Sequence, residues 1–252
     1  MSNITFPDWQ TLGSERCELG ESPFWHPQEQ MLYWVDIPGK QVLRANVYMG
    51  TVEAWDMPSE PGCIAPAATG GLVLALRHGV FRARQWGGAL ELITTLPYDS
   101  QLVRANDGKC DALGRFWVGT IDETKANSAA ALFSIDCRKG APVVVRKAGG
   151  ALTANGLAWS ADGHTLYWAD TPRHIVHAWR FDAASNTLSQ QRTHLQFAAK
   201  PEGWTYADSS YQGRPDGAAV DVQGNYWVSL FEGRRICQFT PAGHLLQTLL
   251  TP

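Results

Sequence analysis

The chain has 252 residues, of which 44% are hydrophobic, and its 21 Lys and Arg against 24 Asp and Glu give a formal net charge of −3. This composition is ample for a buried core, and the weak, mixed charge without a basic tract argues against a nucleic-acid partner. No apolar run approaches transmembrane length and the N-terminus lacks a signal-peptide pattern, so we expect no membrane partner.

The five cysteines are scattered, odd in number and never in a CxxC pair. This usage fits reduced thiols better than a disulfide framework, so a cytoplasmic location is expected.

One pattern recurs along the chain: a polar residue near Gly, a short apolar run, a turn and an aromatic pair. It occurs in GESPFWHPQEQMLYWVD (20–36), RANDGKCDALGRFWVG (104–119), TANGLAWSADGHTLYWAD (153–170) and PDGAAVDVQGNYWVS (215–229). A degenerate copy, GCIAPAATGGLVLALR (62–77), lacks the aromatic pair and the polar residue. Four matched copies indicate an internal repeat.

The polar residue precedes the Trp of its aromatic pair by 11 residues in two copies and by 13 in the other two. We attribute the difference to two extra residues in the turn. The spacing is 11 from Asn106 and Asp216, and 13 from Glu21 and Asn155.

Two further strand-like runs follow each copy, bounded by Gly, Asp, Asn and Pro turns. They are residues 41–47 and 51–57, 79–85 and 90–96, 130–136 and 141–147, 174–181 and 187–197, and 234–240 and 244–250. Each repeat therefore predicts four short antiparallel strands, and no amphipathic helix is found.

Four-stranded units at this period are typical of β-propeller blades, so we predict an all-β fold with residues 1–252 as a single propeller domain. A β-sandwich would also have short strands, but not four copies of one hairpin. The first strand of each propeller blade lines the central channel. This architecture would gather Glu21, Asn106, Asn155 and Asp216 in one cup.

Glu21, Asn155 and Asp216 together offer two carboxylates and one amide oxygen. This oxygen-only set suits Ca²⁺, Mg²⁺ or Mn²⁺, and the lack of His or Cys at these positions argues against a typical zinc site. A lone Asn at a strand start is more often a turn former, but its matched position in the repeat favours a ligand.

The motifs GESPFW, VDIPGK, RANDGKCDALGRFWVGT, TANGLAWS and RPDGAAVD resemble those of the regucalcin (senescence marker protein 30) and gluconolactonase family, over residues 10–250. The resemblance implies a six-bladed propeller that binds one divalent cation, with Ca²⁺ favoured and Mg, Mn, Zn or Fe as alternatives. It implies Glu21, Asn155 and Asp216 as metal ligands, and Arg104 and Asn106 as contacts to a sugar.

The family often has an acidic substrate contact just after the GT of the third repeat. In GTIDETKAN, strict counting places Thr124 there, with Glu123 and Asp122 beside it. We take Glu123 as the predicted contact.

The implied activity is that of a lactonase of carbohydrate metabolism, which opens a sugar (aldono) lactone such as gluconolactone. The metal would polarise the ester carbonyl, and Asp216 would act as general base toward water. The alternatives are a non-catalytic calcium-binding propeller, or a hydrolase of another ester or phosphoester on the same fold.

The longest insertion, residues 197–214, leads to Asp216 and carries Trp204, Tyr206 and Tyr211. These rings are expected either to stack on the sugar or to pack on the scaffold.

Against the six-bladed pattern, the last blade looks incomplete. Only the stretch 9–17 is available as its outer strand, and roughly 30 to 40 residues are missing after residue 250. We therefore expect association with another copy of the chain, a homo-oligomer, to cover the gap.

Overall fold

The computed structural model describes residues 3–14 and 16–252. Its strands form two compact units, one of residues 10–150 and one of residues 1–9 together with 151–252. Helix within the described residues is limited to the 3-10 turn Thr171–Arg173. The expectation of an all-β chain is confirmed, whereas the single domain stays a prediction.

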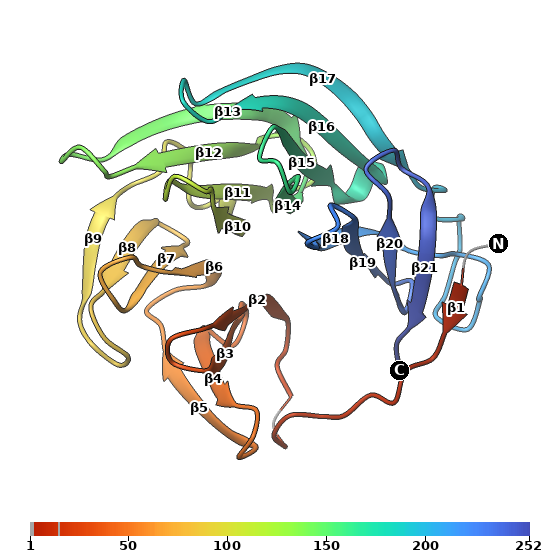
Figure 1. Cartoon of the computed structure of the whole chain (residues 1–252), viewed down its shortest axis with the longest axis horizontal. Helices are drawn as coiled ribbons and strands as arrows, with labels where there is room; N and C mark the ends of the chain where they lie inside the picture. The colour runs from red at the N-terminus through yellow and green to blue at the C-terminus, as the bar shows by residue number, and fades with distance from the viewer. Residues whose placement is uncertain (1–2, 15) are drawn as a thin grey trace. The chain divides into compact units, whose positions relative to one another are not determined.

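The unit of residues 10–150 holds three four-stranded antiparallel sheets, in which strand order follows the sequence (Figure 1). The first consists of β2 (Gly20–His26), β3 (Met31–Asp36), β4 (Gln41–Asn46) and β5 (Thr51–Asp56). The second consists of β6 (Pro61–Pro66), β7 (Leu72–Leu76), β8 (Gly79–Ala83) and β9 (Leu90–Thr94). The third consists of β10 (Val103–Cys110), β11 (Phe116–Asp122), β12 (Ala130–Asp136) and β13 (Val143–Ala151).

The other unit holds two sheets built on the same plan. One consists of β14 (Ala154–Trp159), β15 (Thr165–Asp170), β16 (Ile175–Asp182) and β17 (Thr187–Gln196). The other consists of β18 (Arg214–Val220), β19 (Tyr226–Phe231), β20 (Arg235–Phe239) and β21 (Leu245–Leu250). β1 (Asn3–Thr5) joins this last sheet as a fifth strand, parallel to β21.

The described residues therefore form five four-stranded blades, and the prediction of a six-bladed type with an incomplete last blade is wrong. All four strands of the last repeat are present, and Asn3–Thr5 adds to its outer strand. The stretch 9–17, which we expected to form the outer strand of a sixth blade, contains no strand in its described part. The expected homo-oligomer rested on the incomplete blade and loses this support.

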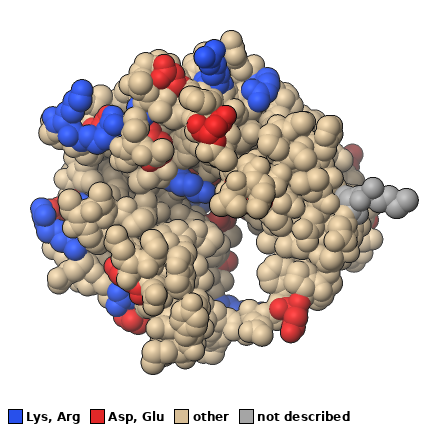
Figure 2. All heavy atoms as spheres, in the orientation of Figure 1, with Lys and Arg blue, Asp and Glu red and all other residues tan. Residues whose placement is uncertain are grey.

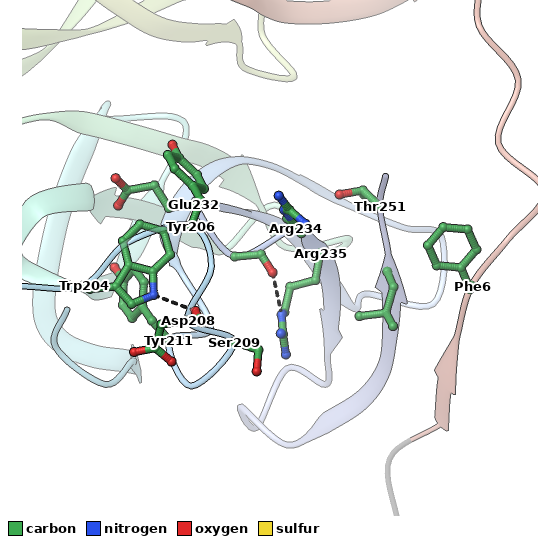
Figure 3. A pocket seen from close by; sticks show the side chains of 12 residues that line it. Phe6, Trp204, Tyr206, Asp208, Ser209, Tyr211, Glu232, Arg234, Arg235 and Thr251 are labelled. Atoms are coloured by element: carbon green, nitrogen blue, oxygen red, sulfur yellow. Dashed lines mark hydrogen bonds between the residues drawn. The ribbon is translucent and has the colours of Figure 1, made fainter. Parts of the chain in front are cut away.

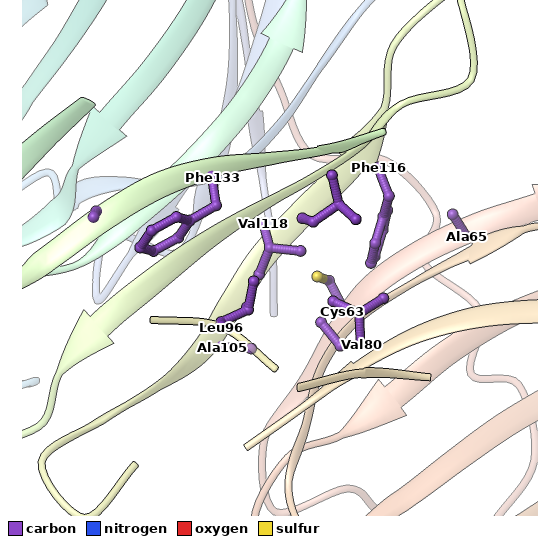
Figure 4. Packing of buried hydrophobic residues seen from close by; sticks show 11 residues of the cluster. Cys63, Ala65, Val80, Leu96, Ala105, Phe116, Val118 and Phe133 are labelled. Atoms are coloured by element: carbon purple, nitrogen blue, oxygen red, sulfur yellow. The ribbon is translucent and has the colours of Figure 1, made fainter. Parts of the chain in front are cut away.

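The core lies between neighbouring blades within each unit. In the unit of residues 10–150, one cluster joins the second and third blades through Cys63, Val80, Phe116, Val118 and Phe133 (Figure 4). These side chains come from the first, second and third strands of the two blades, β6, β8, β11 and β12, and two phenylalanine rings with smaller and β-branched residues fill the space between the sheets. The blade cores therefore hold the first strands, and with them the predicted site residues, in fixed register.

Acidic and basic side chains are interspersed on the surface. On the face seen in Figure 2, neither sign covers a continuous area larger than a few side chains. None of the described helices is long and apolar enough to span a bilayer. The absence of a nucleic-acid partner and the cytoplasmic location stay predictions.

Candidate functional site

The predicted polar residues lie at a β-bulge that recurs in the first strand of four blades. In each of these bulges, two residues of the first strand face one residue of the second. Glu21 and Asn155 stand directly before their bulge, whereas Asn106 and Asp216 are its first residue. The four positions are therefore two matched pairs, one residue apart relative to the bulge. The expected two extra residues in the turn are wrong. Trp34 and Trp168 face their bulge, whereas Trp117 and Trp227 lie two residues before the residue that does, and this difference gives the 11- and 13-residue spacings. A bulge re-aims side chains at a strand end, so it suits a site built from strands.

In the unit of residues 10–150, the three predicted substrate contacts form one cluster. Arg104 Nη1 donates to Asn106 Oδ1 at 3.0 Å, and Arg104 Nε lies 3.4 Å from Glu123 Oε1. Arg104 and Asn106 are buried, while the Glu123 side chain is 36% exposed. Burial lowers the pKa of the Arg104 guanidinium, and the Glu123 carboxylate opposes that change. The cluster therefore combines a desolvated cation, an amide and an accessible carboxylate.

Arg77 completes this cluster, and the sequence reasoning missed it. Its guanidinium donates to Glu123 at 2.8 Å and to both carboxylate oxygens of Glu60, at 2.9 and 3.0 Å. These hydrogen bonds lower the pKa of the Glu60 carboxyl to about 2. Arg77 directly follows β7, in the copy of the repeat that we treated as degenerate. Its position in the repeat could have identified it. In the two blades whose bulges share one register, the corresponding end of the second strand carries Asp36 and Asp170.

The two neighbours of Glu123 make different contacts. Asp122 is fully buried, and its carboxylate accepts hydrogen bonds from the backbone N–H groups of Thr124, Asn127 and Ala129. The Thr124 hydroxyl donates to the same carboxylate at 2.5 Å. Both side chains therefore hold the loop after β11, and Glu123 is the one of the three that contacts Arg104.

In the other unit, Thr171 connects the predicted metal ligand Asn155 to the residue that precedes Asp216, the predicted ligand of the neighbouring blade. Thr171 Oγ1 accepts from Asn155 Nδ2 at 2.8 Å and donates to the Pro215 carbonyl at 2.7 Å. Pro215 directly precedes Asp216, and a Cβ added at Gly156 would stand 3.0 Å from the Asp216 carbonyl oxygen. The first strands of these two blades therefore run side by side at their bulges. Because Nδ2 donates to Thr171, Oδ1 is the oxygen that Asn155 presents as an acceptor.

Glu21, the third predicted ligand, belongs to the unit of residues 10–150. It is half-buried, and the next residue, Ser22, takes a positive φ of 53° and accepts the Ile64 N–H at 3.3 Å. The Glu21 charge acts on Arg104, whose pKa it raises slightly against the effect of burial. Since Asn155 and Asp216 lie in the other unit, the three-residue metal set stays a prediction.

The donor chemistry of these residues fits a hard divalent cation. Carboxylate and amide oxygens are the ligands that Ca²⁺ and Mg²⁺ prefer. Across residues 3–14 and 16–252, no three His, Cys, Asp or Glu side chains gather as a metal cluster, but the predicted set has only two such members. The oriented Oδ1 of Asn155 is the structural feature that supports the fit.

The aromatic residues of the long insertion pack on one another. The Trp204 ring lies 4.9 Å from Tyr206 and 5.3 Å from Tyr211, measured between centroids. Tyr211 is buried, with its hydroxyl 2.6 Å from His174 Nε2. Packing on the scaffold therefore accounts for Tyr211, whereas Tyr206 stays largely exposed.

Four-stranded antiparallel blades whose first strands carry polar residues at a recurring bulge define a β-propeller protein. The chain belongs to the SMP-30/gluconolactonase/LRE-like family, whose model matches residues 19–252. This confirms the resemblance inferred from the motifs.

The alignments with known relatives cover most of this chain and about three quarters of the length of each relative. A 6-deoxy-6-sulfogluconolactonase of Pseudomonas putida is 34% identical over 234 residues, 93% of this chain and 76% of that protein. A regucalcin of Danio rerio is 31% identical over 242 residues, with coverages of 94% and 77%. The solved structure of a luciferin-regenerating enzyme matches with a TM-score of 0.83 at 26% identity, with coverages of 94% and 77%.

Proposed function

We propose that the protein is a metal-dependent hydrolase that opens sugar lactones. The observation that carries the proposal is the Arg104–Asn106–Glu123 cluster, found in a family whose relatives include a named sulfogluconolactonase. With Arg77 and Glu60 the cluster has two positive and two negative charges, so its formal charges cancel. Such a surface favours hydroxyl groups of a polyhydroxy substrate, because it offers donors and acceptors without selecting for an ion.

Glu21, Asn155 and Asp216 would hold the cation, with Ca²⁺ as the first choice and Mg²⁺, Mn²⁺, Zn²⁺ or Fe as alternatives. When bound, a divalent cation supplies Lewis-acid polarisation of an ester carbonyl. Thr171 contributes by fixing the Asn155 amide, so that its oxygen is the atom presented.

Asp216 would take a proton from the attacking water. Its backbone is held on both sides, since the Pro215 carbonyl accepts from Thr171 at 2.7 Å and the Gly217 carbonyl accepts from Ser229 at 3.0 Å. A carboxylate on a fixed bulge can keep one orientation toward water, which general-base catalysis requires. Arg104 and Asn106 would hold the sugar hydroxyls, with Glu123 accepting from another.

The second candidate function is calcium binding without turnover, because several relatives are named regucalcin. Simple ion binding gives no role to Arg104, Asn106 and Glu123. A hydrolase of another ester or phosphoester would use the same residues with a different substrate.

The test is hydrolysis of glucono-δ-lactone by the purified protein, before and after chelation and with Ca²⁺ restored. We expect chelation to abolish activity and Asp216→Asn to lower kcat by about 10²- to 10⁴-fold, the usual contribution of a general base. Asp162→Asn, in an exposed turn, is the matched control and should keep full activity.

Two results would contradict the assignment. Full turnover by Asp216→Asn at saturating metal would remove Asp216 from the chemical step. Metal binding with no hydrolysis of any sugar lactone would favour the calcium-binding alternative.

A further inference from the structure

A pocket of about 230 Å³ lies within the unit of residues 1–9 and 151–252 (Figure 3). Its wall is made by the long insertion on one side, and by the residues around the start of β20 and the end of β21 on the other. Phe6, which follows β1, closes a further side. Neither Asn155 nor Asp216 lines it, so the pocket is separate from the predicted catalytic residues.

One wall of the pocket is aromatic and held in place. Trp204 Nε1 donates to the Asp208 carbonyl at 2.8 Å, and its ring meets both Tyr206 and Tyr211 edge-on. The buried hydrogen bond between Tyr211 and His174 anchors this wall to the blade. Flat aromatic faces with fixed orientation suit the C–H faces of a sugar ring or chain.

The opposite wall is cationic. Arg234 and Arg235 line the pocket, and neither forms an ion pair with any residue in the described part of the chain. Arg235 Nε donates to the Gly233 carbonyl at 2.9 Å, which fixes the direction of its guanidinium.

The acidic residues of the lining do not cancel these charges. Glu232 is neutralised by Lys200 at 2.7 Å and by Arg214 at 3.2 Å. Asp208 accepts the Ser210 N–H and is the remaining negative group. The lining and its ion-pair partners therefore keep a positive charge, which favours an anionic ligand.

We propose that this pocket binds an anionic monosaccharide, an aldonate or a sugar phosphate. The aromatic wall would contact the carbon chain or ring, and the Arg234 and Arg235 guanidinium groups would pair with the carboxylate or phosphate. The volume is below the roughly 300–1,000 Å³ of pockets that take drug-sized ligands, so one sugar unit fits better than a larger molecule. This inference does not depend on lactonase activity.

Isothermal titration calorimetry with the full chain tests the proposal. The probes are D-gluconate and D-glucose 6-phosphate. The controls are D-glucose, which lacks the anionic group, and inorganic phosphate, which lacks the sugar. We expect submillimolar binding of at least one anionic sugar, and binding of both controls weaker by about tenfold or more. Binding of gluconate alone would assign the carboxylate class, and binding of glucose 6-phosphate alone the phosphate class.

Arg234→Gln and Tyr206→Ala change exposed side chains of the pocket, so both should leave folding and hydrolysis intact. Each should weaken the anionic sugar by about tenfold. Arg84→Gln and Tyr48→Ala, exposed residues of the other unit, are the matched controls. Unchanged affinity in both pocket variants, equal binding of D-glucose, or no heat with either anionic sugar would overturn the proposal.

Discussion

A β-bulge changes the direction of a side chain at a single position of a strand, which regular strand alternation cannot do. It adds one residue to the first strand, so the side chain beside it leaves the alternating pattern. Glu21 and Asn155 stand before residues with positive φ, Ser22 at 53° and Gly156 at 60°. A non-glycine residue in the left-handed region is uncommon and costs conformational energy, so the Ser22–Ile64 hydrogen bond helps to hold it. The predicted ligands are thus aimed by the backbone itself.

Arg77 is a positioning residue for the predicted substrate contacts. It holds Glu123 beside Arg104 and holds Glu60 at the opposite side of its own guanidinium. Lys would keep the charge but not the planar fork that bonds both carboxylates.

We expect Arg77→Lys to raise KM for a sugar lactone several-fold with little change in kcat. Glu123 would lose its strongest partner, and its contact to a substrate hydroxyl contributes to ground and transition states alike. Steady-state kinetics with glucono-δ-lactone measures this split, and Arg84→Lys in the exposed pair with Glu91 is the control. A fall in kcat at unchanged KM would show that Arg77 does not act through substrate binding.

At the level of the strand, the sequence predicted most of what the structure contains. The hairpins of four repeats and the two strands that follow each were placed by their alternation and turns; the expected strand 51–57, for example, is β5, Thr51–Asp56. The degenerate repeat was predicted to be a blade. Its close contact with β10 was not predicted, because we interpreted its small residues only as the absence of the aromatic pair and the polar residue. Gly62 is small for a reason: a Cβ there would lie 2.4 Å from the Ala105 carbonyl carbon and 2.7 Å from Asn106 N. This contact sets how closely β6 approaches the bulge of β10.

Gly62→Ala should therefore displace β10 at Arg104 and Asn106. The methyl group meets backbone atoms that cannot rotate away, so we expect a loss of about 1–3 kcal/mol in the free energy of unfolding, together with weaker sugar binding. Gly149→Ala is the matched control, because the three atoms nearest its Cβ would belong to the guanidinium of the exposed, flexible Arg146 side chain. Urea unfolding and KM measure the two effects. Stability and KM equal to those of the wild type would show that the contact is not tight in solution.

The local pattern gave the number of blades that the structure contains, and the family resemblance gave a wrong one. The sequence holds five repeats of four predicted strands, and the described residues form five blades, whereas a sixth was expected only because the family has six. The strand Asn3–Thr5 was missed because three residues pairing in parallel with Leu245–Leu250 leave no local signal. The predicted oxygen ligands came from their repeat positions and the predicted sugar contacts from the family resemblance, while Thr171 and Arg77 act through contacts that only the folded chain creates.

The N-terminal residues pack with the last blade, although most of the sequence separates them. β1 pairs with β21 from Asn3↔Gln247 to Thr5↔Leu249, and Trp9 Nε1 donates to the Leu250 carbonyl at 2.7 Å. Removing residues 1–9 would leave β21 as an open edge. We therefore expect the free energy of unfolding to fall by an amount on the order of 1–3 kcal/mol and the amides of β21 to exchange faster. Exchange in β2–β5 should be unchanged. Hydrogen exchange by mass spectrometry measures this, and Ile4→Ser, which keeps the backbone pairing of an exposed residue, should leave the exchange of β21 as it is. Protection of β21 that survives the truncation would mean that β1 contributes nothing to the stability of the last blade, and that the blade is complete with its own four strands.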